Sequence, residues 1–200
     1  MGSRIMHYAI AAELAKKHPV NGAFFLGNEA PDTNKESNTP KELTHFMTLD
    51  ANQEHVMHIE NFTQKYHAAS NDDFVIGYYA HLVADDIWLK TMFHKYIPSA
   101  GEPDRNRLLA LYYADFARLN QLIIEHYQLT FNSNLVAKPK HIIDEIQYQD
   151  LPMVWREVQM DFEEIPEAGD LQLFKLADVF EYIDATVKIL SVAMQHDYAF

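Results

Sequence analysis

The chain has 200 residues, of which 48% are hydrophobic, and its 16 basic against 29 acidic residues give a formal net charge of −13. This length suits one domain with a sizeable core, and the hydrophobic content argues against disorder. The absence of cysteine excludes disulfides, thiolate zinc sites and a cysteine nucleophile, while the acidic balance disfavours binding to nucleic acids and anionic membranes.

The first residues, MGSRIMHYAIAAELAKKHP, lack the long apolar core of a secretion signal. No stretch reaches the about 18 apolar residues that a membrane span needs. We therefore predict a cytoplasmic protein without a membrane span, folded as one domain over residues 1–200.

Helical periodicity dominates the first half of the chain. His7 and Leu14 fall on one face of a helix, and a second helix is predicted at about 53–67. Between them, 27–44 is predicted as a loop, and its length in a compact domain favours a functional role. The stretch 72–93 is apolar on most sides, so it predicts a buried central helix that opens near its first two aspartates.

The second half is predicted to be helical as well. Amphipathic stripes predict helices over 104–127 and 176–194, and a shorter helix is predicted between 140 and 148. Loops are expected at 97–104 and 164–170, where proline and glycine cluster. Because sustained period-2 alternation is scarce, we predict an all-α fold, a single-domain helical bundle.

His81 and Asp85 lie four residues apart in the predicted central helix and therefore share one of its faces. A carboxylate inside such an apolar helix is costly unless it is paired or bound to a metal. Pairs of this kind are also common as hydrogen-bonded partners in a protein core. Taken alone, the two residues favour that second interpretation.

His7, Asp32 and His45 each have an ordinary explanation too. His7 on an apolar stripe is typical of a core histidine, Asp32 of a turn residue and His45 of a surface loop. Together with His81 and Asp85, however, they would supply nitrogen and oxygen ligands that suit zinc and, less selectively, manganese, iron or nickel. Two metals that share a carboxylate are typical of sites that hydrolyse phosphoesters.

Four short pieces occur in one order along the first half of the chain: SRIMH ending at His7, LGNEAPD ending at Asp32, THF around His45, and GYYAHLVADDIW with His81 and Asp85. In these pieces the chain resembles the zinc-dependent phospholipase C family, which is itself similar to the all-helical zinc nucleases that act on single strands. The second half of the chain matches only as generic helix.

The resemblance implies an all-α domain with a metal cluster in a cleft and zinc as the cofactor, with two ions expected and one to three compatible. It implies that one zinc binds Asp32, His45, His81 and Asp85, and that Asp85 bridges to a second zinc, which also takes His7. In the family, the amino end of the mature chain completes this second site. Asp32 is the family's favoured base for activating the attacking water.

The family's third zinc uses two further histidines and a glutamate, and this pattern is blurred here. His94 remains a candidate for a metal ligand or for a residue that supports one, and His141 and Glu145 form a candidate pair on the predicted short helix. Asp115 lies on an apolar helical stripe, where an unpaired carboxylate is costly. A metal ligand, a partner of a ligating histidine and an ion pair with a core arginine all remain open for it.

We predict from these residues a zinc-dependent hydrolase of phosphate esters, a phosphodiesterase that uses a metal-activated water. A small soluble phosphoester suits the sequence at least as well as a lipid, because no apolar loop or basic amphipathic helix for lipid docking is evident. Nuclease activity is the alternative among enzymes, but the acidic chain would not help to hold a polyanion. Two other hypotheses stay open: a non-catalytic metal-binding or interaction protein with one structural site, and a core hydrogen-bond network without metal.

Overall fold

The computed structural model describes residues 2–35, 39–133, 139–163 and 169–195. As predicted, the fold is all-α, and one two-stranded hairpin accompanies the helices. No helix in these ranges is long and apolar enough to cross a membrane. The α-helices are α1 (Arg4–Ala15), α2 (Gly22–Glu29), α3 (Lys41–Thr44), α4 (Ile59–Tyr66), α5 (Asp73–Trp88), α6 (His94–Tyr96), α7 (Arg105–Tyr127), α8 (Leu151–Glu163) and α9 (Leu176–Gln195). The other elements are the 3₁₀ turns η1 (Ala30–Lys35), η2 (His67–Ala69) and η4 (Tyr148–Asp150), the π-helical turn η3 (Leu89–Phe93), and the strands β1 (Met47–Leu49) and β2 (His55–Met57).

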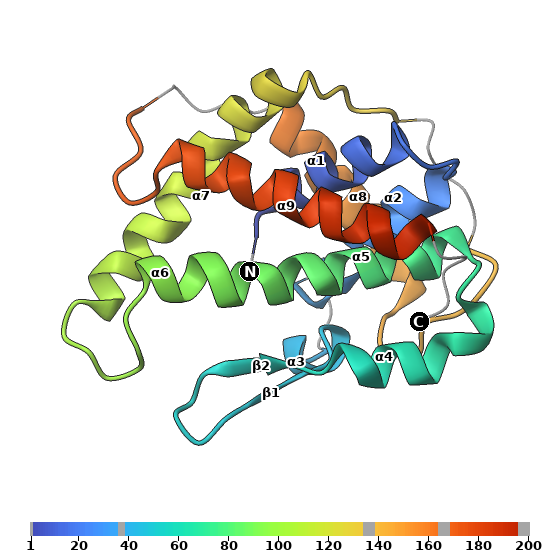
Figure 1. Cartoon of the computed structure of the whole chain (residues 1–200), viewed down its shortest axis with the longest axis horizontal. Coiled ribbons are helices and arrows are strands. Elements are labelled where there is room, and N and C mark those ends of the chain that lie inside the picture. Colours follow the sequence, from blue (N-terminus) through green and yellow to red (C-terminus); the bar gives the residue numbers. More distant parts are fainter. Residues whose placement is uncertain (1, 36–38, 134–138, 164–168, 196–200) are drawn as a thin grey trace.

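Helix α5 lies at the centre of the fold because its sequence is apolar on nearly every side. It begins as predicted, where the Asp72 side chain accepts a hydrogen bond from the Phe74 N–H at 2.8 Å. Helices α1, α2, α4 and α9 contact α5, and Figure 1 shows α9 lying along it, with the hairpin and α4 at the opposite edge. The buried hydrophobic side chains of these helices form one connected core.

Helices α2 and α5 cross in close backbone contact because each has a glycine at the crossing. A Cβ atom on Gly27 would overlap the Phe74 carbonyl oxygen, and a Cβ atom on Gly77 would overlap the Phe24 carbonyl oxygen. This close approach of the two backbones lets the Asn28 side chain donate a hydrogen bond to the Gly77 carbonyl at 3.4 Å. The crossing therefore fixes the end of α2 against the middle of α5.

The long amphipathic helices are confirmed. The first predicted helix is α1, and those predicted at 104–127 and 176–194 are α7 and α9. The loop predicted at 97–104 is also present, whereas most of the loop predicted at 164–170 lies outside the described residues.

The prediction of one long loop over 27–44 is wrong. Helix α2 continues through Glu29, η1 follows without a break, and α3 ends at Thr44. The first part of this segment is helical because the close contact with α5 buries it. Asp32 and His45 are therefore held by short helices instead of a long loop.

The predicted second helix at 53–67 begins with a strand, and only its later part is helical, as α4. Strand β2 pairs with β1 in antiparallel register, with Met47 opposite Met57. Asp50 stabilises the turn between them by accepting two backbone N–H bonds across it, at 2.8 and 2.9 Å. Strands of this length are too short to show sustained alternation.

The predicted helix between 140 and 148 is wrong, because this segment folds as turns. Ile143 and Ile146 reach the core from these turns. The Tyr148 hydroxyl closes the segment by donating to the His141 carbonyl and accepting the Ile143 N–H, each at 2.9 Å. These side-chain bonds replace the backbone ladder of a helix.

Candidate metal centre

The five residues singled out in the first half of the chain come together in the interior. His7 lies in α1, Asp32 in η1, and His45 directly after α3, while His81 and Asp85 lie one turn apart in α5. Each is at most 4% exposed. Four separate segments therefore contribute polar side chains to one buried cluster, which we call the His/Asp cluster.

The side chains of His45, His81, Asp32 and Asp85 face one another. His45 Nε2 lies 3.6 Å from both Asp32 Oδ1 and Asp85 Oδ2. It also lies 3.4 Å from His81 Nε2, which is itself 3.5 Å from Asp85 Oδ2. Two imidazole nitrogens and two carboxylates thus surround one small volume.

His7 approaches the other oxygen of Asp85. Its Nε2 atom is 3.2 Å from Asp85 Oδ1, and its ring stacks on that of His81 with 3.9 Å between centroids. The backbone nitrogen of Gly2 donates to the same Oδ1 atom at 3.1 Å. The two Asp85 oxygens therefore serve two different groups of neighbours.

The hydrogen bonds of the Nδ1 atoms of His81 and His45 determine which ring nitrogen of each histidine faces the centre of the cluster. His81 Nδ1 lies 2.7 Å from the Asn28 carbonyl oxygen, which only accepts, so Nδ1 carries the proton. His45 Nδ1 lies 3.2 Å from the Lys41 carbonyl oxygen and 2.8 Å from the Thr44 hydroxyl. In the neutral rings both Nε2 atoms then present lone pairs to each other and to the carboxylates, which is the orientation of metal-binding histidines.

The charges of the cluster are those of a site that attracts a cation. Burial lowers the pKa of His45 to about 4, although Asp32 opposes that shift, so the ring is neutral at pH 7. Burial likewise lowers the pKa of His7, and His81 adds to the effect. Burial by itself raises the pKa of Asp85, but the contacts with His81 and His7 outweigh burial and lower this pKa to well below its usual range. Neutral imidazoles thus surround a buried carboxylate anion.

The donor atoms fit a divalent metal ion. Asp32, His45 and His81 offer atoms that all lie within 4.8 Å of one another, and so do His7, His81 and Asp85. A tetrahedral ion with bonds of about 2.0–2.1 Å spaces its donors about 3.3 Å apart. The contacts in the cluster are close to this spacing, and within the described residues Asp85 Oδ2 has no hydrogen-bond donor. A buried carboxylate oxygen without a donor is costly unless a cation binds it.

His94 and Asp115, the other candidate metal ligands, lie outside these two groups of donor atoms. The side chain of His94 is exposed and contacts the ring of Phe93. Asp115 is fully buried and accepts hydrogen bonds from the backbone N–H groups of 172–174 and from Arg118, at 2.7 to 3.1 Å. Of the alternatives open for Asp115, the structure therefore shows an ion pair with an arginine.

His141 and Glu145 are not neighbours on a helix. His141 Nδ1 lies 2.7 Å from an Asp72 oxygen, whereas Glu145 accepts from Lys65 at 2.7 Å and from Tyr66 at 2.6 Å. The two side chains hold the 139–147 turns against different elements.

Several residues at the site carried no usable signal in the sequence. The Gly2 nitrogen and the Asn28 carbonyl act through backbone atoms, which residue identity does not reveal. Arg4 differs, because its position just before His7 indicates either a contact with a substrate phosphate or, with more weight, an ordinary ion pair. The structure shows ion pairs of Arg4 with Asp161 and Glu157 of α8, each at 2.7 Å. Lys41 could not be identified as a cavity residue from the sequence, because its position depends on how the short helix α3 is oriented in the fold.

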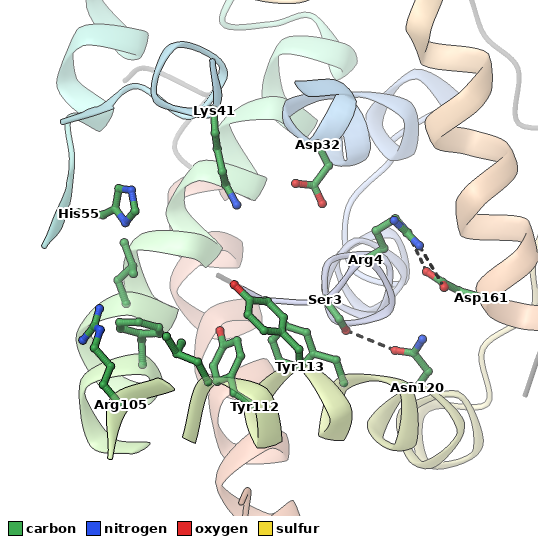
Figure 2. Close-up of a pocket in the computed structure, with 16 residues that line it drawn as sticks. Ser3, Arg4, Asp32, Lys41, His55, Arg105, Tyr112, Tyr113, Asn120 and Asp161 are labelled. Carbon is green, nitrogen blue, oxygen red and sulfur yellow. Dashed lines mark hydrogen bonds and ion pairs between the residues drawn. The ribbon is translucent and has the colours of Figure 1, made fainter. Parts of the chain in front are cut away.

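A cavity of about 570 Å³ adjoins the His/Asp cluster. Asp32 belongs both to the cluster and to the cavity wall, and Gly2, which also lines the cavity, contacts Asp85 of the cluster. Figure 2 shows Asp32 and Lys41 on one side of this space and Tyr112 and Tyr113 facing them from α7. A small molecule in the cavity would therefore meet an edge of the cluster.

Comparison of the chain with protein-family models, curated proteins and solved structures found no match. The similarity to zinc-dependent phospholipase C accordingly stays a resemblance in short motifs.

Proposed function

We propose that this protein is a metal-dependent hydrolase of phosphate esters, a phosphodiesterase, with its centre at the His/Asp cluster. The observation that carries the proposal is the convergence of imidazole lone pairs and carboxylate oxygens, 3.2 to 3.6 Å apart, at the edge of a cavity. Such a donor set without thiolates suits zinc and, less selectively, manganese, iron or nickel.

The spacing supports two ions that share one carboxylate. Asp32, His45, His81 and Asp85 would hold the first ion, and Asp85 and His7 the second. The Gly2 nitrogen contacts the same Asp85 oxygen as His7 does, where the resemblance implies an amino group. As an amide this nitrogen donates a hydrogen bond, so His7 and Asp85 are the protein ligands of the second ion in this proposal.

Bound divalent ions supply positive charge for phosphoryl oxygens and make nearby water more acidic. The chain's own contribution is to place Asp32, whose carboxylate lines the cavity, beside the attacking water. Asp32 accepts a proton as the water oxygen bonds to phosphorus and the ester oxygen departs with its electron pair. Burial of the cluster keeps bulk water away from the developing charge.

The position of Asp32 favours catalysis over a purely structural site. A structural ion is enclosed by its ligands, whereas a catalytic one keeps a position open to substrate. Asp32 belongs to the cavity wall, so one side of the cluster is reached from that cavity. The substrate class is a phosphoester of small size, soluble or lipid, because the formal net charge of −13 repels nucleic acid.

The test is hydrolysis of bis(p-nitrophenyl) phosphate by zinc-loaded protein and by Asp32→Asn. We expect hydrolysis by the wild type and a fall in kcat of about 10²-fold or more in the variant, since a general base contributes 10²–10⁴-fold. Asp86→Asn is the matched control, because Asp86 neighbours Asp85 on α5 but pairs with Lys90 at 2.6 Å. No hydrolysis with zinc, manganese, iron or nickel would contradict the proposal, as would full activity in Asp32→Asn.

A further inference from the structure

The cavity beside the His/Asp cluster is lined by one cation that has no ion-pair partner among the described residues. Three cations line it, and two of them are paired: Arg4 with carboxylates of α8 at 2.7 Å, and Arg105 with Glu54 at 3.2 Å. Lys41 also lines the cavity, is half-buried, and forms no ion pair within the described residues. A partly desolvated ammonium in a cavity is a binding group for an anion.

Lys41 lines the cavity together with Asp32, the cluster residue that is part of its wall. Figure 2 shows its amino group pointing into the space between His55 and Asp32, above the hydroxyl of Tyr113. An anion bound by Lys41 would thus lie between the cavity and the cluster.

The opposite wall of the cavity is aromatic. Tyr112, Tyr113 and Phe116 from α7 line it, and Phe93 from η3 joins them. The Tyr113 ring stands nearly perpendicular to its two α7 neighbours, at 84° and 86°. Its side chain is 66% exposed, so a ring face remains available to a ligand. Aromatic side chains placed in this way favour a flat organic group.

We infer that this cavity binds a small phosphoester whose alcohol carries an aromatic ring. Lys41 binds an anionic phosphate oxygen, and the aromatic side chains of Tyr113 and Phe116 contact the ring of the ligand. The inference rests on the proposed function for the identity of the anion as a phosphoester. It adds a substrate class, aryl over alkyl phosphoesters, and names Lys41 and Tyr113 as the residues that set specificity. Neither residue belongs to the His/Asp cluster, so both can be changed without removing its ligands.

The test uses phenylphosphonate and methylphosphonate, whose carbon–phosphorus bonds resist hydrolysis, with binding to zinc-loaded protein followed by calorimetry. Lys41→Met should weaken binding of both probes by about tenfold or more, because a hydrogen bond to a charged group is lost. Lys41→Arg should restore most of that affinity. Tyr113→Ala should weaken phenylphosphonate by about fivefold or more and leave methylphosphonate unchanged, whereas Tyr113→Phe keeps the ring and the affinity.

Two controls keep the result specific. Lys188→Met removes an exposed lysine of α9 outside the cavity and should bind both probes as the wild type does. Zinc content should be equal in all variants, which separates a lost phosphate contact from a lost metal. The inference is overturned if Lys41→Met binds both probes normally, or if the wild type binds phenylphosphonate no better than methylphosphonate.

The outcomes also separate this inference from the proposed function. Binding that depends on Lys41 and Tyr113 in a protein that hydrolyses no ester would support the cavity and reject the hydrolase. Hydrolysis of aryl phosphodiesters with an unchanged KM in Lys41→Met and Tyr113→Ala would support the hydrolase and reject the inference about the cavity.

Discussion

Asp85 connects the two halves of the His/Asp cluster. Its Oδ1 atom contacts His7 and the Gly2 nitrogen, while its Oδ2 atom faces His45 and His81. The residue is fully buried, and removing a carboxylate from water costs several kcal/mol unless a cation or donors compensate. In our proposal, two ions, one on each oxygen, would compensate for this cost in the most apolar helix of the fold.

Asp115 is a buried carboxylate with a different purpose. It holds the start of the segment before α9 by accepting the backbone N–H groups of 172, 173 and 174. Burial raises the pKa of Asp115, but these amide bonds, together with Arg118, lower it more, so the net pKa lies below its usual value. The hydrogen bonds therefore stabilise the folded state as long as the carboxylate is charged.

We predict that Asp115→Asn lowers the free energy of unfolding by about 2–3 kcal/mol at pH 7 without changing metal content. A depressed folded-state pKa means that the contribution is complete above the unfolded value of about 3.9 and is lost as the pH falls through the folded value. Urea unfolding of both proteins at pH 7 and pH 3 measures the effect. A difference that grows towards pH 3, or a loss of metal, would refute this role.

At the scale of elements, the α2–α5 crossing positions the cluster. The glycine contact brings the Asn28 carbonyl within 2.7 Å of His81 Nδ1, and this bond sets which ring nitrogen faces the centre. Helix packing and ligand orientation therefore share one cause.

Gly77→Ala should separate the two helices, because the added Cβ overlaps the Phe24 carbonyl oxygen. We expect a loss of stability of about 2 kcal/mol or more and weaker metal binding. Gly169→Ala is the control, since its Cβ meets only the Arg118 side chain, at 3.2 Å, which can move. Thermal unfolding and metal titration give the readouts, and a Gly77→Ala protein as stable as Gly169→Ala would disprove the steric argument.

Most of the long helices were predictable from the sequence, and the short elements were not. Helices α7 and α9 each bury a repeated apolar stripe, so periodicity reveals them, and α5 is revealed by a long stretch that is apolar on most sides. Helix α8 is an exception, because no helix was predicted over its 13 residues. The β1–β2 hairpin depends instead on a few backbone hydrogen bonds and on Asp50 in its turn. The turns near Tyr148 depend on contacts with residues that are distant in sequence, such as Tyr66 and Asp72.

At the scale of the whole molecule, the cluster joins segments that lie far apart along the chain. His7 and Asp85 are 78 positions apart, yet their side chains touch. The i,i+4 spacing alone linked only His81 to Asp85. The other three residues were grouped with them because all five are metal-ligand types, and the motif resemblance then divided the five between two ions. The cavity, the identity of the partners of Arg4 and the orientation of Lys41 required the folded chain.

Metal binding at the cluster, as proposed, would be a property of the whole molecule, because the candidate ligands lie in or next to α1, η1, α3 and α5. An ion that binds only the folded chain adds stability, by about 2.7 kcal/mol when its concentration is 100 times its Kd. Removal of the ion should loosen these four elements together. Chelation is thus expected to lower the melting temperature and not only the activity.

The most direct test of the account is metal content, measured by elemental analysis on protein purified without metal-affinity steps, together with melting curves in chelator. The account predicts two divalent ions of the zinc class per chain, a lower melting temperature in chelator, and loss of ions in a folded His81→Ala variant. His94→Ala, which changes an exposed histidine outside the cluster, should keep both ions. The account would be contradicted if the wild-type protein contained no metal and its melting temperature were unchanged by chelator. A His81→Ala variant that keeps its ions would also contradict it.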